Sequence, residues 1–178
     1  VVTRPDAVHI CYCHTPARYV WDLWGTYLDV SRIRGVKRSV AQYFMHTFRV
    51  SDVTAAQRVD YFIANSNFTA SRIAKFYRRS SRLIFPPVSV ARFSPGECKD
   101  YYLSLGQLAA YKRIDVLVDA FNAMPDKKLI IAGDGPMKKR LQAMAGKNIT
   151  FAGRIDEQEA VRLYQGCRAF LFPGVEDF

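Results

Sequence analysis

Apolar residues follow two kinds of spacing along the chain, that of a buried strand and that of a helix. Short, nearly continuous apolar runs predict strands, and apolar residues three or four apart predict helices. In the first half we expect strands at residues 7–14, 59–66 and 81–88, with helices at residues 32–50 and 68–79. In the second half we expect strands at residues 101–106, 127–133, 148–153 and 168–174, with helices at residues 113–124, 136–145 and 156–167.

The order of strand followed by helix recurs through both halves of the chain. Helices of this length between apolar strands predict βαβ units and parallel sheets that are covered on both faces. The fold class is therefore α/β, with two Rossmann-like pieces. Residues 91–100 combine Pro, Gly and charge with little apolar periodicity, which is typical of a linker. We accordingly place one domain at residues 1–93 and a second at residues 94–178.

Composition places the chain among globular proteins, because its 178 residues are 49% hydrophobic and 13% aromatic. The apolar runs are far shorter than the roughly 20 residues that span a bilayer, so no transmembrane helix is expected. No signal peptide is visible at the start. The cysteines lack the spacing of a zinc site, and we expect reduced, mostly buried thiols in a cytoplasmic protein. They are Cys11, Cys13, Cys98 and Cys167.

Basic residues are unevenly distributed along the chain. The formal net charge is +10, and residues 1–93 hold 14 Lys or Arg against 5 Asp or Glu, while residues 94–178 hold 12 against 11. A basic half beside a nearly neutral half suggests a polyanionic partner, whether nucleic acid, an anionic membrane surface or a phosphorylated substrate. The helix expected at residues 32–50 has the basic and aromatic composition of an interfacial helix, and a solvated basic face is the alternative.

The strand-to-helix junctions of the second half hold the candidate chemistry. In GQLAAYKR, Gly106 permits a tight turn, while Lys112 and Arg113 lie near a helix start, where an anion would balance their charge. Two solvated surface cations are the alternative. The next junction, GDGP, begins at Gly133 and fits neither a Walker loop nor G-x-G-x-x-G, so it is either a plain tight turn or a ligand loop.

Two further positions stand where an α/β sheet could bind a ligand. In GRIDEQE, Asp156 can cap a helix, which leaves Arg154 for solvent or for a ligand. His14 ends the first strand, at the kind of edge where ligands of open α/β sheets bind. A structural role is the alternative for His14. No Ser-His-Asp or Cys-His arrangement can be assembled from the sequence.

Taken together, these motifs resemble one enzyme family. GQLAAYKRIDVLVDAF, LIIAGDGP, ITFAGRI and FLFPGVEDF, in this order and spacing, resemble the C-terminal domain of family 4 glycosyltransferases of the GT-B fold. CYCHTPARYVWD and FIANSNFTASRIAKFYRRSSRLIFPPVSVARF resemble the second half of the N-terminal domain in O-antigen and exopolysaccharide mannosyltransferases. The resemblance covers nearly the whole chain. It implies that both Rossmann-like domains are incomplete and that the chain is a fragment, inactive alone.

The activity that the resemblance implies is retaining glycosyl transfer in polysaccharide biosynthesis. The sugar, mannose in the similar branch, would move from a nucleotide diphosphate donor such as GDP-mannose to a glycan or a polyprenyl-diphosphate-linked acceptor. No cofactor and no metal are implied. The location would be cytoplasmic, peripheral to the membrane if the basic half binds it. Another GT-B enzyme, such as a sugar-nucleotide epimerase or a phosphorylase, is the alternative, and a nucleic-acid binder is less favoured because no such signature is present.

The resemblance also assigns roles to residues that surround the donor diphosphate. Lys112 matches the lysine that contacts the diphosphate. Position 107 is usually an arginine that shares this task, and Gln107 supplies a hydrogen bond without the charge, for which Arg113 could compensate. Amides of the glycine-bearing loops, including that of Gly133, would add to the stabilisation of charge that grows on the β-phosphate.

The remaining assignments concern the base and the transferred sugar. Arg154 and Ile155 match the loop beside the nucleotide base. Glu176 matches the first glutamate of an E-x7-E motif, which contacts the donor sugar, and the second would fall beyond the last residue. His14 matches the histidine of the N-terminal domain that reaches this sugar.

Overall fold

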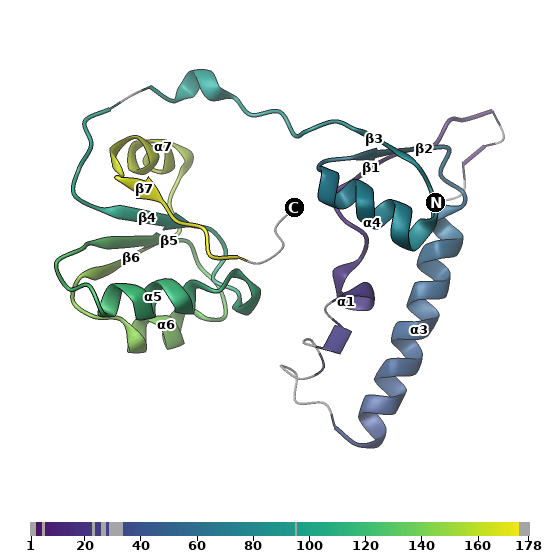
Figure 1. The fold of residues 1–178 in the computed structure, drawn as a ribbon, viewed down its shortest axis with the longest axis horizontal. Coiled ribbons are helices and arrows are strands. Elements are labelled where there is room, and N and C mark those ends of the chain that lie inside the picture. The colour runs from purple at the N-terminus through teal and green to yellow at the C-terminus, as the bar shows by residue number, and fades with distance from the viewer. Residues whose placement is uncertain are drawn as a thin grey trace. The chain divides into compact units, whose positions relative to one another are not determined.

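Residues 3–4, 6–22, 24–25, 28, 34–94 and 96–174 are described by the structure, a computed structural model. The chain divides into two compact units, Val1–Pro87 and Val88–Asp177 (Figure 1). Each unit consists of a parallel β-sheet with helices packed against it. The predicted α/β class with parallel sheets is confirmed.

Three parallel strands in the order β1-β2-β3 form the sheet of the first unit. The strands are β1 Ile10–Cys13, β2 Tyr61–Ala64 and β3 Ser81–Leu83, and the helices are α1 Arg18–Trp21, α3 Val36–Ala56 and α4 Asn67–Tyr77. Phe62 and Ala64 of β2 pack with Ile73 and Tyr77 of α4 and with Ala56 of α3. This cluster is the hydrophobic core that holds the two longer helices on the sheet.

The start of α4 shows how the sequence sets a helix boundary. Ser66 adopts an extended backbone, and its hydroxyl accepts a hydrogen bond from the Thr69 amide at 3.1 Å. Asn65, Ser66 and Asn67 are all residue types that can cap a helix, and the structure assigns this role to Ser66. The helix ends after Tyr77, where Arg78 takes a left-handed conformation.

One carboxylate joins α1, α3 and α4 of the first unit. Asp52 of α3 accepts hydrogen bonds from the Trp21 indole N–H of α1 and from the Tyr77 hydroxyl of α4, both at 2.8 Å. Burial, together with the hydrogen bond to Asp52, raises the pKa of Tyr77 above its ordinary value. Burial, with the nearby Cys11 and Asp52, likewise raises the pKa of Cys13 to about 12. A thiol with such a pKa stays protonated at neutral pH and packs as an apolar side chain.

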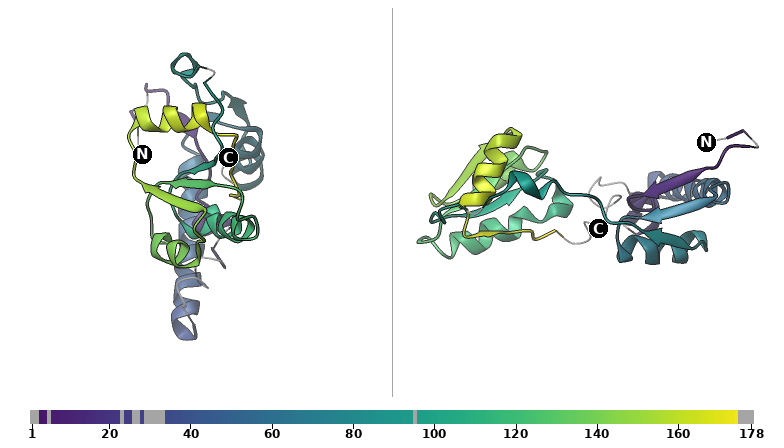
Figure 2. Two further views of the ribbon diagram at one scale, coloured as in Figure 1. Left: turned by 90° about the vertical axis from the view of Figure 1, so that its left-hand side faces the viewer. Right: turned by 90° about the horizontal axis from the view of Figure 1, so that it is seen from above.

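The second unit has four parallel strands in the order β6-β5-β4-β7. The strands are β4 Tyr102–Leu105, β5 Leu129–Ala132, β6 Ile149–Gly153 and β7 Ala169–Phe170. The α-helices are α5 Ile114–Asn122, α6 Lys138–Met144 and α7 Glu157–Gly166, and the short 3₁₀ helices are η1 Val90–Arg92 and η2 Ala110–Lys112. Figures 1 and 2 show α5 and α6 on one side of the sheet and α7 on the other. Leu129 and Ile131 pack with Val118, Phe121 and Leu141 in the core.

Two boundaries differ from the expectation. The chain divides after Pro87, whereas the sequence suggested a boundary after Phe93. The Phe93 ring contacts Tyr164 of α7 at 6.0 Å between centroids, which attaches this segment to the second unit. The helix expected at residues 32–50 spans Val36–Ala56 instead, because Asp52 and Ala56 provide the packing that continues it. Residues 32 and 33 lie outside the described residues.

Loss of the Asp52 carboxylate should weaken the first unit selectively. We expect Asp52→Ala to lower the free energy of unfolding by about 2–3 kcal/mol, because the Tyr77 hydroxyl and the Trp21 indole N–H lose their acceptor. Urea denaturation followed by tryptophan fluorescence measures this, since Trp21 and Trp24 both belong to the first unit. Tyr77→Phe should cost only about 1 kcal/mol, because one hydrogen bond is lost and the ring remains. Equal stability of Asp52→Ala and wild type would contradict this account.

Candidate functional site

Loops at the carboxyl ends of β4, β5 and β6 are joined to one another by backbone hydrogen bonds. The Gly106 amide donates to the Ala132 carbonyl at 3.0 Å, and the Leu108 amide donates to the Asp134 carbonyl at 2.9 Å. The Gly133 amide donates to the Gly153 carbonyl at 2.7 Å. We call these three joined loops, residues 106–109, 133–137 and 153–155, the loop edge of the second unit. Ligands of open α/β sheets bind at such an edge.

Glycine is required where the loops after β4 and β5 touch. Gly133 has a φ of 133°, and a Cβ atom there would lie 1.8 Å from the Gly106 carbonyl oxygen. A Cβ atom at Gly135 would lie 2.6 Å from the Leu108 carbonyl oxygen. The GDGP motif therefore lets two backbones approach more closely than any side chain would allow. This packing accounts for both glycines.

Lys112 lies at the loop edge, between two aromatic rings. It ends η2, and its ammonium lies 5.3 Å from the centroid of the Tyr111 ring and 5.3 Å from that of the Phe172 ring. Phe172 follows β7, so Lys112 links the loop after β4 to the segment after β7. The side chain is half-buried, unlike a solvated surface cation. Cation–π contacts of this kind orient an ammonium.

Arg113 and Gln107 lie near Lys112 and differ in their side-chain contacts. Arg113 has a left-handed backbone, with φ at 53°, and its Nε donates to the Asp115 carboxylate at 3.2 Å. Asp115 lies in the first turn of α5 and thereby keeps Arg113 beside the helix start. Gln107 is exposed at the beginning of the loop after β4. The structure thus brings Gln107, Lys112 and Arg113 to one edge of the sheet.

The loop after β6 contributes Arg154 and Ile155. Arg154 is exposed and Ile155 is half-buried. Asp156 accepts a hydrogen bond from the Glu159 amide at 2.8 Å and so caps α7, as predicted. Glu176 lies outside the described residues.

Sequence reasoning missed Lys138 at this edge. Its ammonium lies 3.6 Å from the Asp134 carboxylate and 3.9 Å from the point where a Cβ atom of Gly153 would stand. Asp134 also accepts a hydrogen bond from the Gly135 amide at 2.9 Å. The spacing of Asp134 and Lys138 by four residues could have revealed this pair.

His14 follows β1 at the carboxyl end of the first unit's sheet. Its carbonyl accepts a hydrogen bond from the Thr69 hydroxyl at 2.9 Å, which fixes the backbone against α4. The exposed ring makes an edge contact with Tyr12 at 5.3 Å between centroids. A cavity of about 480 Å³ beside β1 is lined by His14 together with Cys13, Asp52 and Tyr77. The backbone of His14 is therefore structural, while its ring remains accessible.

Asn65 is a buried polar residue of this unit whose side-chain amide has no partner among the described residues. It is 1% exposed, and neither its Oδ1 nor its Nδ2 has a hydrogen-bond partner in the described part of the chain. The register pairs Cys13 with Ala64, so Asn65 follows β2 as His14 follows β1. Buried amides are rarely left unpaired.

A comparison with protein families identifies the second unit. Residues 91–178 match the family described as glycosyl transferases group 1. The match covers nearly all of the second unit, including every residue of the loop edge. The second unit thus matches the glycosyl transferases group 1 family, and this match confirms the resemblance to family 4 glycosyltransferases.

A characterised relative extends the similarity into the first unit. D-rhamnosyltransferase WbpZ of Pseudomonas aeruginosa is 30% identical over 132 residues. The aligned part covers 65% of this chain and 34% of WbpZ. The chain thus spans about a third of the length of this relative.

Solved structures show the same fold at low sequence identity. Anabaena HepE, crystallised with UDP and glucose, is similar with a TM-score of 0.62 and 16% identity, over 78% of this chain and 50% of HepE. TarM of S. aureus is similar with a TM-score of 0.54 and 15% identity, over 64% of this chain and 25% of TarM. These similarities confirm the fold, which is that of the GT-B glycosyltransferases.

Two glycines allow a matched test of the loop edge. Gly133→Ala should destabilise the second unit by about 3 kcal/mol or more, because the new Cβ atom meets a carbonyl oxygen that cannot move without β4. Gly153→Ala should cost only about 1 kcal/mol, since its φ of 72° strains the backbone but the nearest atom, the Lys138 ammonium nitrogen, would lie at an ordinary contact distance of 3.9 Å. Hydrogen exchange at the amides of β5 measures both. A smaller effect at Gly133 than at Gly153 would refute the close-approach explanation.

Proposed function

We propose that the chain is part of a glycosyltransferase that moves a sugar from a nucleoside diphosphate donor. The observation that carries this proposal is the position of Lys112, half-buried at the loop edge of a unit that matches the glycosyl transferases group 1 family. Two aromatic rings hold its ammonium beside the joined loops at the carboxyl ends of the strands. A diphosphate is the group that such a cation would recognise.

The chemistry required is stabilisation of a leaving nucleoside diphosphate. Negative charge grows on the β-phosphate as the glycosidic bond breaks, and a fixed ammonium lowers the energy of that charge. Lys112 would supply the ammonium and Arg113, oriented by Asp115, a second positive charge. Gln107 would donate a hydrogen bond, whereas the Gly133 amide already donates to the Gly153 carbonyl. The acceptor hydroxyl would attack from the same face as the leaving group, with retention of configuration.

The remaining site residues are proposed on the family resemblance. Arg154 and Ile155 follow β6 at the loop edge, which supports a place beside the nucleotide base. Glu176 would contact the donor sugar. His14 would reach the same sugar, and its accessible ring on a fixed backbone supports this role.

For the donor sugar we propose mannose or its 6-deoxy form. Mannose follows from the branch that the sequence resembles, and the relative WbpZ is named as a D-rhamnosyltransferase. D-Rhamnose is 6-deoxy-D-mannose, so the two proposals share the configuration of every ring carbon. The neighbour HepE was solved with UDP and glucose, so the base is best tested with both GDP and UDP. We propose a glycan or a lipid-linked glycan as the acceptor, at the cytoplasmic face of the membrane.

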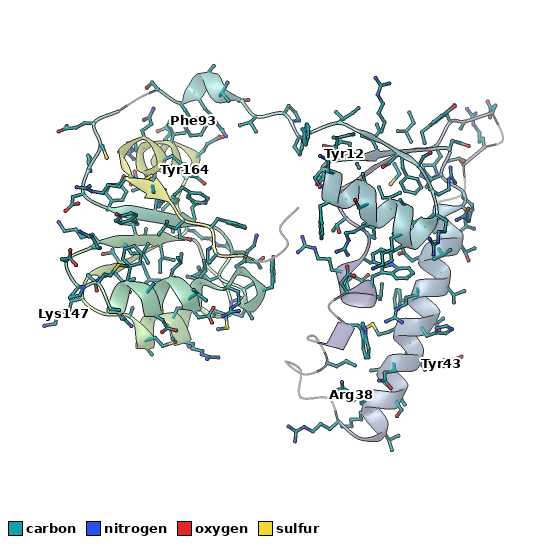
Figure 3. All side chains as sticks on the ribbon, in the orientation of Figure 1. Tyr12, Arg38, Tyr43, Phe93, Lys147 and Tyr164 are labelled. Carbon is teal, nitrogen blue, oxygen red and sulfur yellow. The ribbon has the colours of Figure 1, made fainter. Side chains whose placement is uncertain are left out.

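Lys112→Ala should weaken binding of nucleoside diphosphates. One charge-assisted hydrogen bond is worth about 1.5–3 kcal/mol, so the dissociation constant should rise by about 10- to 100-fold. Calorimetric titration of the chain with GDP and with UDP measures this. Lys147→Ala is the matched control, because Lys147 is exposed just before β6, at the amino end of that strand (Figure 3). Equal losses in both variants, or none in Lys112→Ala, would refute the proposed site. Gln107→Arg should bind equally well or more tightly.

His14→Ala and Glu176→Ala should separate function from stability. In a full-length enzyme that carries this sequence, each change should lower the rate of sugar transfer by about 100-fold, the usual size of a lost catalytic contact. The midpoint of thermal unfolding should stay at the wild-type value. Transfer is followed with a radiolabelled donor and unfolding by circular dichroism. A variant that unfolds without a separate kinetic defect would show that its residue is structural.

A further inference from the structure

His14 is held at two points, one on its backbone and one on its ring. Its carbonyl accepts a hydrogen bond from the hydroxyl of Thr69 at 2.9 Å, and Thr69 is fully buried. Its imidazole ring meets the Tyr12 ring edge-on, with the centroids 5.3 Å apart and the planes at 80°. Helix α4 thus fixes the main chain of His14, while strand β1 supplies a support for its ring.

The Tyr12 ring is itself fixed at its far end. Its hydroxyl donates a hydrogen bond to the carbonyl of Ile84 at 3.0 Å. Ile84 follows β3, and its own amide donates to the Ala64 carbonyl of β2 at 3.0 Å. Because β2 lies between β1 and β3, the Tyr12 side chain reaches across β2 on the sheet of the first unit (Figure 3). A phenol anchored at both ends keeps its ring in one position, which makes it a rigid support for its neighbour.

Tyr12 and His14 lie on the face of the sheet that is turned away from α3 and α4. Successive side chains of a strand point to opposite faces, so Tyr12 and His14 share one face and Cys13 has the other. Cys13 packs in the core with Phe62 and Ala64. Tyr12 is 38% exposed, and His14 is exposed as well. The His14 ring therefore stands outside the core, and the contact with Tyr12 gives it the order that core packing would otherwise provide.

The backbone of His14 is held by a chain of hydrogen bonds at the start of α4. The Ser66 hydroxyl donates to the Thr69 hydroxyl at 3.2 Å, and the Thr69 hydroxyl donates to the His14 carbonyl. One turn further along α4, Arg72 is ion-paired with Asp22, which follows α1. Buried chains of hydrogen bonds reinforce one another. Helix α4 therefore holds both ends of the segment from His14 to Asp22.

We propose that Tyr12 and Thr69 are positioning residues, which hold the His14 imidazole in the orientation that sugar transfer requires. The inference rests on the proposed function, because that function places His14 at the transferred sugar. A side chain at a strand end otherwise rotates among staggered χ1 positions, and only one of them presents the ring to a given point. Errors of about 1 Å in the placement of such a group reduce rates by about 100-fold. The alternative is that the Tyr12 hydroxyl only joins β3 to the sheet, which would make Tyr12 a residue of stability alone.

Nuclear magnetic resonance tests the support without any substrate. The chain contains three histidines, and the His14 ring signals are those absent from the His14→Ala spectrum. We expect nuclear Overhauser effects between the Tyr12 and His14 rings, and Tyr12→Leu should move the His14 signals toward those of a free imidazole. Tyr12→Phe retains the ring and loses the tether, so its shift should be smaller. Tyr61→Leu is the matched control, since Tyr61 is 64% exposed on the same face of β2.

Transfer kinetics of a full-length enzyme that carries this sequence test the consequence. Tyr12→Leu should lower kcat about fivefold, because the imidazole then samples about three staggered positions and loses the ring contact. KM for the donor should change by less than about twofold, since Lys112 and not His14 binds the diphosphate. Thr69→Val should also lower kcat about fivefold, the effect of one lost hydrogen bond, and Thr69→Ser should restore it because the hydroxyl is kept. In a His14→Ala background, Tyr12→Leu should have no further effect.

The outcomes separate this inference from the proposed function. The positioning role is overturned if the His14 signals stay in place in Tyr12→Leu, or if the loss of kcat persists undiminished in the His14→Ala background. A lower midpoint of thermal unfolding with wild-type kcat would show that Tyr12 serves stability alone. Full activity of His14→Ala would remove the role of His14 in transfer, and the positioning role with it. Unchanged nucleotide binding by Lys112→Ala would count against the proposed donor site and would leave these results unaffected.

Discussion

Direct contact between two backbones governs the architecture of the second unit. Where the loops after β4 and β5 meet, Gly133 and Gly135 bring main-chain atoms to a separation that excludes any Cβ atom. The hydrogen bonds of the Gly106 and Leu108 amides then join the loops. Because the loops are fixed to each other, η2 begins at a defined place. The Lys112 ammonium therefore lies over the Phe172 ring rather than in bulk water.

Most of the fold could be predicted from the sequence, because each strand and helix has its own apolar pattern. Every expected strand is present, and α4, α5 and α7 lie within two residues of the expected ranges. The extension of α3 to Ala56 could not be read from spacing, since it depends on contacts of Asp52 with two other helices. The attachment of Phe93 to Tyr164 is likewise a tertiary contact, without a local signal.

The sequence predicted which strand ends carry the candidate site, but it did not predict the contacts between the site residues. Strand ends followed by glycine and cations pointed to Lys112 and Arg113, and the structure brings both to the loop edge. The pairing of Arg113 with Asp115 and the place of Lys138 beside Gly153 follow from backbone geometry, which the sequence does not display. The sequence does not single out Asn65, because an asparagine before a helix commonly serves as a cap. Its unpaired side-chain amide becomes evident only from its burial in the structure.

The two faces of α3 separate two selective pressures that usually act on the same side chains. Folding of the first unit uses Arg49 and Asp52, which face the protein. Val36, Val40 and Phe44 are exposed and contribute little to that folding, so they are free to drift or to adapt while the unit remains intact. Relatives that work on different surfaces could therefore diverge at Val36, Val40 or Phe44 without any compensating change in the core.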